Sequence, residues 1–499
     1  MGRRTGNGGA GELRAGTFGT FDSVVMAVGG CGPAYTVAAT VPVLVATVGL
    51  AGPAVLLYCA LPTIGIALAF RRLGRLDVNA GASYAWVARA LHPFLGFLSG
   101  WALVVSATVF LVSATLPAGA AALALVDPAL SGRTGPATAV GAGLFVLMAG
   151  VVALGARIGP YARRIITGTQ LALLLSFAVA ALATDRPKTE FSASWFGFGH
   201  FDTAHGFVAG ALVAGVMYAG WDVESNLNEE TRGGRRGFGL GGLIAVVVSF
   251  TVFSLFTVAT VRLIGVDAVR RNPDGFLSEL GEAVWPGWGG RLLVLAVVLS
   301  TVATLETALL QATRTLFAMG RDGTVPRVFG RIHRAWGTPA VATGWMAGVA
   351  LLVVVAAATA GSGARFLRDA VSGIGLHIAF YYALAGLSAV VAYRKVLFRS
   401  AGNLVFGGLW PLAGAVFMGW VFVVSLPELT GSALAIGLGA LALGLVPMFA
   451  AWLRDLPYFS PRPLDPGRMA VGGELYGDAG AAAGAAGAMR RRDGVLSDF

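Results

Sequence analysis

The sequence predicts an all-α integral membrane protein with 12 transmembrane helices. Hydrophobic residues make up 56% of its 499 residues and charged residues only 12%, about half the share found in an ordinary soluble domain. A soluble chain of this size needs far more polar residues to cover its surface. The composition therefore excludes a soluble enzyme, a disordered protein and a secreted disulfide scaffold, and it indicates a polytopic membrane protein.

Apolar runs long enough to span a bilayer supply the predicted helices. A spanning helix needs about 20 largely apolar residues, and the chain contains 12 such runs, separated by short polar, basic or glycine-rich segments. They lie near residues 20–47, 50–70, 94–126, 137–155, 160–184, 204–228, 238–264, 291–318, 339–359, 366–393, 403–426 and 431–453.

The basic residues orient these helices. With the N-terminus placed in the cytoplasm, about three quarters of the 36 lysines and arginines fall in cytoplasmic segments, as the positive-inside rule requires. The net charge of +11 is then an orientation signal rather than a sign of nucleic-acid binding. We expect a multi-pass protein of the cell membrane with both termini cytoplasmic and the lipid bilayer as its partner. The sequence carries no signal for an oligomeric state.

Two of the apolar runs are interrupted. The first contains Gly29, Gly30, Gly32 and Pro33 within five residues, a composition that disfavours a regular helix. The sixth places two carboxylates, directly after residues 217–221, in a span that is otherwise apolar. Interruptions at corresponding positions of two halves are the best sequence indication of an inverted-repeat transporter site.

The positions of the breaks divide the chain into segments. Residues 18–184 form the first predicted repeat, with helices 1–5, and residues 203–393 form the second, with helices 6–10. The last two helices occupy residues 403–453. Residues 1–17 are a predicted cytoplasmic N-terminal tail, and residues 454–499, which include the low-complexity stretch GDAGAAAGAAGAMRRRDG, are a predicted disordered cytoplasmic tail.

An ordered set of local motifs adds a family resemblance. These motifs are GGCGPAY in helix 1, NAGASYAWVARALHPFLG at the entry to helix 3, YAGWDVESNLNEETR in helix 6, and ATRTLFAMGRDGTVP followed by HRAWGTPAVA after helix 8. Together they resemble the amino acid–polyamine–organocation (APC) permease superfamily, in particular its amino acid permeases. The resemblance implies a leucine-transporter-type fold, a 5+5 inverted repeat plus two C-terminal helices. It also implies secondary active transport of amino acids or related amines by alternating access.

Such a site must hold a zwitterion or an organic cation away from bulk water. Broken helices provide free amides for a carboxylate, and free carbonyls for an ammonium. Pro33 has no N–H, which removes one donor from the turn that binds the carboxylate in similar permeases and keeps amines open as substrates. The candidate residues in helix 1 are Gly29, Gly30, Cys31, Gly32, Ala34 and Tyr35.

Helix 6 provides the other side of the predicted site. By resemblance, the carbonyls of Met217, Tyr218 and Ala219 face the substrate amine, next to Gly220. Two interpretations of Trp221 stand side by side: an aromatic wall or gate, formed together with Tyr218, that attracts an ammonium, and a structural role, either plain packing or an interfacial anchor.

Acidic residues inside the membrane are costly, and each is a functional hypothesis. We expect a coupling or gating role for Asp222 and Glu306. For Glu224 we expect either that role or a structural one, as a buried pair or a residue of the cytoplasmic vestibule. Some proton-coupled relatives place a lysine in helix 5, where this chain aligns Gln170, which does not titrate. The coupling ion is therefore left open among a proton, sodium at the hydroxyls of helix 8, and exchange without an ion. The hydroxyls are those of Ser300, Thr301 and Thr304.

Charged residues gather at the cytoplasmic ends of two helices. Glu229 and Glu230 end helix 6, and Arg314, Arg321 and Asp322 lie at the end of helix 8. Two interpretations stand side by side: ion pairs among them that lock the inward face, and a solvated charged rim. We expect no enzyme activity, no metal and no cofactor beyond a coupling ion, because no catalytic motif is present. A polyamine or organocation exchanger is the first alternative, and a channel or non-transporting sensor of the same fold is the second.

Overall fold

A computed structural model describes residues 18–155, 160–185, 187–201, 204–231, 239–272, 275–359 and 363–464, with positions 13, 16, 466, 470 and 471. These residues form helices joined by short connections, together with a two-stranded parallel sheet of β1 (Asp77–Val78) and β2 (Ala470–Val471). The fold is therefore all-α in its membrane part, as the composition predicts.

Ten helical stretches in the described part of the chain are long and apolar enough to cross a membrane. The first, Thr20–Leu76, combines α1 (Thr20–Cys31), α2 (Pro33–Val48), η1 (Gly49–Ala51) and α3 (Gly52–Leu76) and so covers two of the predicted spans. A further apolar helix, α9 (Ala204–Met217), is too short to be counted as a membrane span by itself, because the helix ends at Met217. A multi-pass helical architecture is thus confirmed, whereas the total of 12 spans and the repeat stay predictions.

The other long helices are α5 (Pro93–Val126), α7 (Thr134–Ala153), α8 (Pro160–Ala183), α11 (Leu240–Leu263), α14 (Gly289–Arg321), α15 (Ala340–Thr359), α16 (Gly363–Tyr393), α18 (Trp410–Glu428), α19 (Gly431–Leu443) and α20 (Leu445–Trp452). Shorter helices are α4 (Ser83–Ala90), α6 (Pro128–Ser131), α10 (Val223–Asn226), α12 (Val266–Arg271), α13 (Phe276–Val284) and α17 (Ala401–Leu404). Single turns used below are η4 (Asn228–Glu230) and η8 (Pro457–Phe459).

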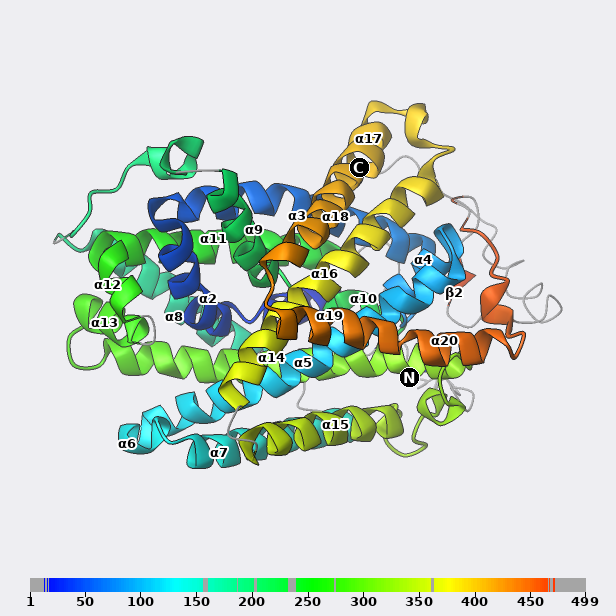
Figure 1. Ribbon diagram of the computed structural model, residues 1–499, viewed down its shortest axis with the longest axis horizontal. Coiled ribbons are helices and arrows are strands. Elements are labelled where there is room, and N and C mark those ends of the chain that lie inside the picture. Colours follow the sequence, from blue (N-terminus) through cyan, green and yellow to red (C-terminus); the bar gives the residue numbers. More distant parts are fainter. Residues whose placement is uncertain are drawn as a thin grey trace, which may run out of the picture.

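Helix α14 lies inside the bundle. Figure 1 shows it running across the molecule, with α5 crossing it and α7 and α15 side by side along one flank. It also contacts α1, α2, α8 and α10. Most of its threonines are buried and donate their hydroxyls to carbonyls of the preceding turn, as Thr304 does to Ser300 at 2.7 Å. Polar side chains are satisfied in this way inside an apolar helix, and α14 can therefore present polar groups to both interrupted helices.

Small residues let helices approach closely elsewhere in the bundle. A Cβ atom on Gly119 of α5 would overlap the carbonyl of Ala137 in α7, and one on Gly414 of α18 would lie 2.6 Å from the Pro62 carbonyl in α3. Without a hydrophobic force between helices in lipid, such backbone proximity is a main source of association. Part of the glycine content therefore serves packing.

The chain after Trp452 begins the segment that the sequence predicts to be a disordered tail. Its first part, residues 454–464, contains the single turn η8 (Pro457–Phe459) and two buried side chains, those of Tyr458 and Leu464, which are 0% and 9% exposed. The low-complexity stretch and most of the predicted N-terminal tail lie outside the described residues.

Candidate substrate site between two interrupted helices

The break in helix 1 is confined to one residue. Helix α1 continues through Gly29 and Gly30 to Cys31, Gly32 adopts a left-handed conformation with φ of +52°, and α2 begins at Pro33. The predicted interruption over residues 29–33 is therefore wrong in extent. The two glycines stay helical, and helix α14 supports this turn through the Thr304 hydroxyl, which donates to the Gly29 carbonyl at 3.2 Å.

The break in helix 6 is longer. Helix α9 ends at Met217, residues 218–222 are non-helical, and α10 resumes at Val223. Gly220 has φ of +90°, a conformation that side-chain-bearing residues avoid. The carbonyls of residues 217–219 lie at the end of α9, where the helix dipole is negative. This negative end of α9 is an environment that favours a positive charge.

The two breaks touch each other. A Cβ atom on Gly30 would overlap the Gly220 carbonyl oxygen, and one on Gly220 would overlap the Gly30 carbonyl oxygen. Only two glycines allow this direct contact between backbones. The structure thus brings the predicted halves of the site together, and they meet without an intervening side chain.

Several candidate side chains take part in packing. Tyr218 donates its hydroxyl to the Leu56 carbonyl at 2.9 Å. Trp221 lies between Phe70 and Tyr382, with ring centroids 5.1 and 5.3 Å away. Of the two interpretations of Trp221, the structure favours packing.

The remaining candidates line the helix-1 side. Cys31 and Ala34 are buried, and Met217, from α9, is fully enclosed. Tyr35 is partly exposed and meets Phe110 of α5 edge-on at 5.8 Å. Ala34 and Tyr35 belong to the first turn of α2, where amides have no acceptor within the helix. Their N–H groups therefore remain suitable for a carboxylate.

Asp222 follows the helix 6 break and is fully buried. Its carboxylate accepts hydrogen bonds from the Gln311 amide at 2.8 Å and from the hydroxyls of Tyr381 and Tyr382 at 3.1 and 2.9 Å. All three donors are neutral, and they come from α14 and α16. These partners are not evident from the sequence, although polar side chains in otherwise apolar helices indicate that such contacts exist.

Glu224 has a structural environment. Its carboxylate accepts a hydrogen bond from the Gly242 amide at 2.7 Å, in the first turn of α11. A carboxylate at a helix N-terminus satisfies free amides and complements the helix dipole. Of the two readings of Glu224, the geometry supports a buried structural role.

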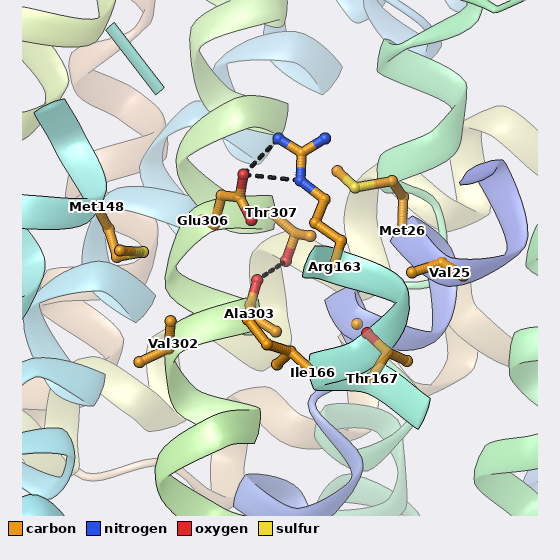
Figure 2. A pocket seen from close by; sticks show the side chains of 11 residues that line it. Val25, Met26, Met148, Arg163, Ile166, Thr167, Val302, Ala303, Glu306 and Thr307 are labelled. Atoms are coloured by element: carbon orange, nitrogen blue, oxygen red, sulfur yellow. Dashed lines mark hydrogen bonds and ion pairs between the residues drawn. The ribbon is translucent and has the colours of Figure 1, made fainter. Parts of the chain in front are cut away.

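Glu306 is paired with a cation. The Arg163 side chain of α8 binds it through two nitrogens, with Nε to Oε1 at 2.9 Å. Figure 2 shows these side chains pointing toward each other across a pocket next to helix 1. Arg163 lies in the first turn of α8, where a basic residue resembles an orientation signal, so the sequence does not indicate its partner. The pocket is lined mainly by apolar groups of α1, α7, α8 and α14, among them Val25, Gly29, Met148, Ile166 and Ala303.

Gln170 lies on α8, two turns beyond Arg163. Its side chain is fully buried, and within the described residues neither its amide nitrogen nor its oxygen has a hydrogen-bond partner. The Ser300 hydroxyl on α14 is likewise buried and unpaired there. Unsatisfied buried polar groups are costly, so both positions are candidates for contact with water, an ion or substrate.

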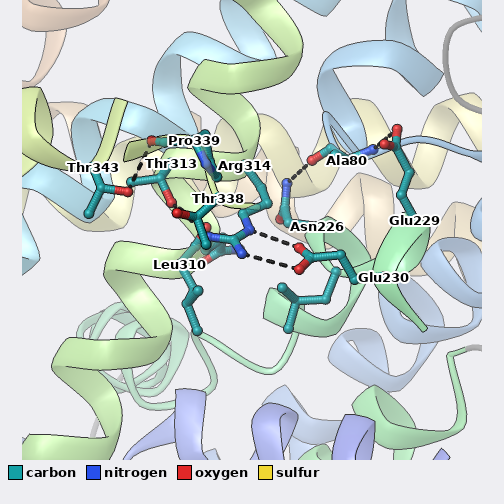
Figure 3. A network of polar contacts seen from close by, with 12 residues as sticks. Ala80, Asn226, Glu229, Glu230, Leu310, Thr313, Arg314, Thr338, Pro339 and Thr343 are labelled. Atoms are coloured by element: carbon teal, nitrogen blue, oxygen red, sulfur yellow. Dashed lines mark hydrogen bonds and ion pairs between the residues drawn. The ribbon is translucent and has the colours of Figure 1, made fainter. Parts of the chain in front are cut away.

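The predicted ion pairs after helices 6 and 8 are present. Arg314 binds Glu230 through two nitrogens at 2.9 and 3.2 Å, and Arg321 binds Glu229 at 3.0 and 3.1 Å. We call these two pairs the ionic lock. Figure 3 shows the Arg314–Glu230 pair and the neighbouring Ala80, whose amide donates to Glu229 at 2.9 Å. The first pair is almost fully buried, with side chains 3% and 6% exposed.

The start of helix 1 extends this network. The Phe18 amide donates to the Glu230 carbonyl at 3.1 Å, and the Phe18 ring lies beneath the Arg163 guanidinium at 5.6 Å. Asp22 accepts two hydrogen bonds from Arg164 at 2.7 and 2.9 Å. Helices α1, α8 and α14 and the segment after α10 are therefore tied together at one end of the bundle.

These features define a polytopic helical membrane protein in which two interrupted helices meet, an arrangement typical of secondary transporters. A family model described as amino acid permease matches residues 18–441. The chain belongs to this family of amino acid permeases, within the APC superfamily.

The relatives are transporters. A vacuolar cationic amino acid transporter of Arabidopsis thaliana is 26% identical over 336 residues, which cover 62% of this chain and 51% of that protein, so the chain matches about half of its length. An uncharacterised transporter of Mycobacterium tuberculosis is 26% identical over 87% of this chain and 92% of its own length. A low-affinity putrescine importer of Escherichia coli is 23% identical over 76% and 81%, respectively.

Proposed function

We propose that the protein moves amino acids or related amines across the cell membrane by alternating access, with the substrate between the helix breaks at Gly32 and residues 218–222. The observation that carries this proposal is the backbone contact of Gly30 with Gly220. It joins the free amides at the head of α2 to the free carbonyls at the end of α9. Separation of the two backbones opens a site of opposite partial charges, which fits a zwitterion.

The proposed topology has 12 helices, a 5+5 repeat with α1–α2 and α9–α10 as equivalent broken helices, and both termini in the cytoplasm. The distribution of basic residues supports this orientation. In it, the ionic lock and the Arg163–Glu306 pair lie on the cytoplasmic half of the bundle. The structure then corresponds to a state closed to the cytoplasm, and transport requires these pairs to separate.

An amine or polyamine substrate is the second candidate. Asp222 lies beside the break, and its described hydrogen-bond donors are all neutral, so its negative charge is left to attract a cation. Pro33 also removes one carboxylate donor from the opposite side. The names of the putrescine importer and the cationic amino acid transporter are consistent with such substrates.

Coupling to a proton or to sodium is part of the proposal. Asp222 is the proton candidate because it is a buried carboxyl beside the helix 6 break whose described donors include no cation. The Gly29 carbonyl with the Thr304 hydroxyl is the sodium candidate, because both present oxygen atoms, which hard cations prefer. Gradients of each ion, imposed separately across the vesicle membrane, distinguish the two.

Uptake into proteoliposomes tests the function. We expect saturable uptake and counterflow of an amino acid or polyamine, abolished in Gly32→Leu, because that side chain would enter the contact with Thr304. Gly143→Leu is the matched control, since nothing lies within 4 Å of a Cβ at Gly143. Binding without accumulation would instead indicate a sensor, flux without counterflow a channel, and normal uptake in Gly32→Leu would overturn the site.

A further inference from the structure

The chain folds back on itself after its last long helix. Residues 456–464 and strand β2, which we call the C-terminal strap, lie against α4 and the loop between α3 and α4. Tyr458 is fully buried and stacks on Tyr84 with ring centroids 4.7 Å apart, and its hydroxyl donates to the Pro93 carbonyl at 3.1 Å. This aromatic stack is the main anchor of the strap.

Two further contacts hold the strap. Arg89 of α4 pairs with Asp77 at 3.1 Å and donates its Nε to the Arg462 carbonyl at 2.9 Å. Strand β2 pairs in parallel with β1, with Val471 opposite Val78, and Figure 1 places β2 beside α4 at one end of the bundle. The described contacts of the strap are with α4, with the loop before α4 and with the first residues of α5, where the ring of Phe459 meets that of Phe94 edge-on at 5.6 Å. Release of the strap would therefore free this end of α5 as well as α4.

The loop that receives the strap also holds the ionic lock. The Ala80 amide donates to Glu229, and Arg321 donates to the Asn79 side chain at 3.4 Å. The Tyr84 hydroxyl lies 3.0 Å from the Thr324 hydroxyl, just beyond α14. The Tyr84 side chain therefore contacts both the strap, through its ring, and the segment that follows α14, through its hydroxyl.

We propose that the C-terminal strap is an autoinhibitory element. When docked, it holds α4 and residues 77–82 against the Arg321–Glu229 pair and keeps the cytoplasmic side closed. When it is released, the loop moves away from Glu229 and the lock opens. This inference rests on the proposed function, because it takes the lock as the cytoplasmic gate of a transporter.

Thiol labelling tests the strap without requiring transport. Thr307 lines the pocket beside Glu306 and is 3% exposed, so a Thr307→Cys variant reports access through the open gate. A membrane-impermeant maleimide is applied to the cytoplasmic side of inside-out vesicles, and labelling of a parent with only the buried Cys31 and Cys59 is subtracted.

The strap variants are Tyr458→Ala and Leu464→Asp in the Thr307→Cys protein. Loss of the aromatic stack should raise the labelling rate roughly two- to tenfold, the range expected for such a pair. Tyr458→Phe, which keeps the stack, should change it less. Phe398→Ala removes a ring that is 84% exposed, in the turn Leu397–Arg399 between α16 and α17, and it should leave the rate unchanged.

The outcomes separate the two proposals. Faster labelling in both strap variants, with monodisperse purified protein, supports autoinhibition even if the substrates tested for uptake are wrong. Unchanged labelling in Tyr458→Ala and Leu464→Asp overturns it, whether or not the wild-type protein transports. Equal acceleration by Phe398→Ala would also overturn it, because the effect would then not come from the strap.

Discussion

Removal of one partner of the Arg314–Glu230 pair should destabilise the closed protein strongly. Both side chains are nearly fully buried, and their two hydrogen bonds measure 2.9 and 3.2 Å. A buried charge that loses its partner typically costs about 3–5 kcal/mol. We therefore expect a loss of this size in Glu230→Leu and in Arg314→Leu. The double variant should lose much less, because it buries no unpaired charge.

The assay is equilibrium unfolding in mixed micelles of the wild type, both single variants and the double variant, analysed as a double-mutant cycle. The exposed Lys188–Glu279 pair is the matched control, with nitrogen and oxygen 3.6 Å apart and side chains 57% and 42% exposed. Such a pair contributes about 0–1 kcal/mol. Two results would contradict a buried, coupled pair. In the first, the single variants at Glu230 and Arg314 lose no more free energy of unfolding than the control variants. In the second, the double variant loses the sum of the two single losses.

Three further predictions concern the site and the lock. Gly220→Ala should abolish uptake, because the new Cβ overlaps the Gly30 carbonyl and the left-handed conformation costs about 1–2 kcal/mol. The control Gly215→Ala, which has open space around its Cβ, should transport normally. Uptake by Gly220→Ala would contradict the contact between the two breaks. Asp222→Asn and Glu306→Gln should alter the pH dependence of uptake, and unchanged profiles in both would remove them from proton coupling. Burial raises the pKa of the Asp322 carboxyl, at the lock end of α14, to about 7 from 3.8, despite the opposing effect of Arg321 and a hydrogen bond from Tyr84. The folded protein then binds this proton more tightly than the unfolded chain, so the stability of the wild type should fall as pH rises from about 4 to 7. In thermal denaturation, Asp322→Asn should lack this component of the pH dependence. The same pH dependence in the variant would exclude Asp322 as its source.

Local composition predicted the features that depend on residues adjacent in the sequence. The apolar runs predicted a multi-pass helical protein, and the glycines and proline near Gly32 predicted the helix 1 break. Its extent was overestimated, because a helical Gly29 and Gly30 gain tertiary support that the local sequence does not show. Gly29 accepts the Thr304 hydroxyl from α14, and Gly30 packs on Gly220.

Partners distant in sequence were harder to predict. Ion pairs of Arg314 and Arg321 with the acids after helix 6 were one of two possibilities that the sequence left open, and the structure contains them. Arg163 was not paired with Glu306, since 143 positions separate them and a basic residue near a helix start resembles an orientation signal. The tyrosines that bind Asp222 were missed for the same reason, because their contact depends on how α16 packs beside the helix 6 break.

The central claim is that substrate binds where the two interrupted helices meet. The most direct measurement is a cryo-electron microscopy structure in nanodiscs, with the best substrate from the uptake screen. We expect ligand density between the first turn of α2 and the carbonyls of residues 217–219, with Gly30 and Gly220 moved apart. Density in the Arg163–Glu306 pocket alone, with the Gly30–Gly220 contact intact, would contradict it.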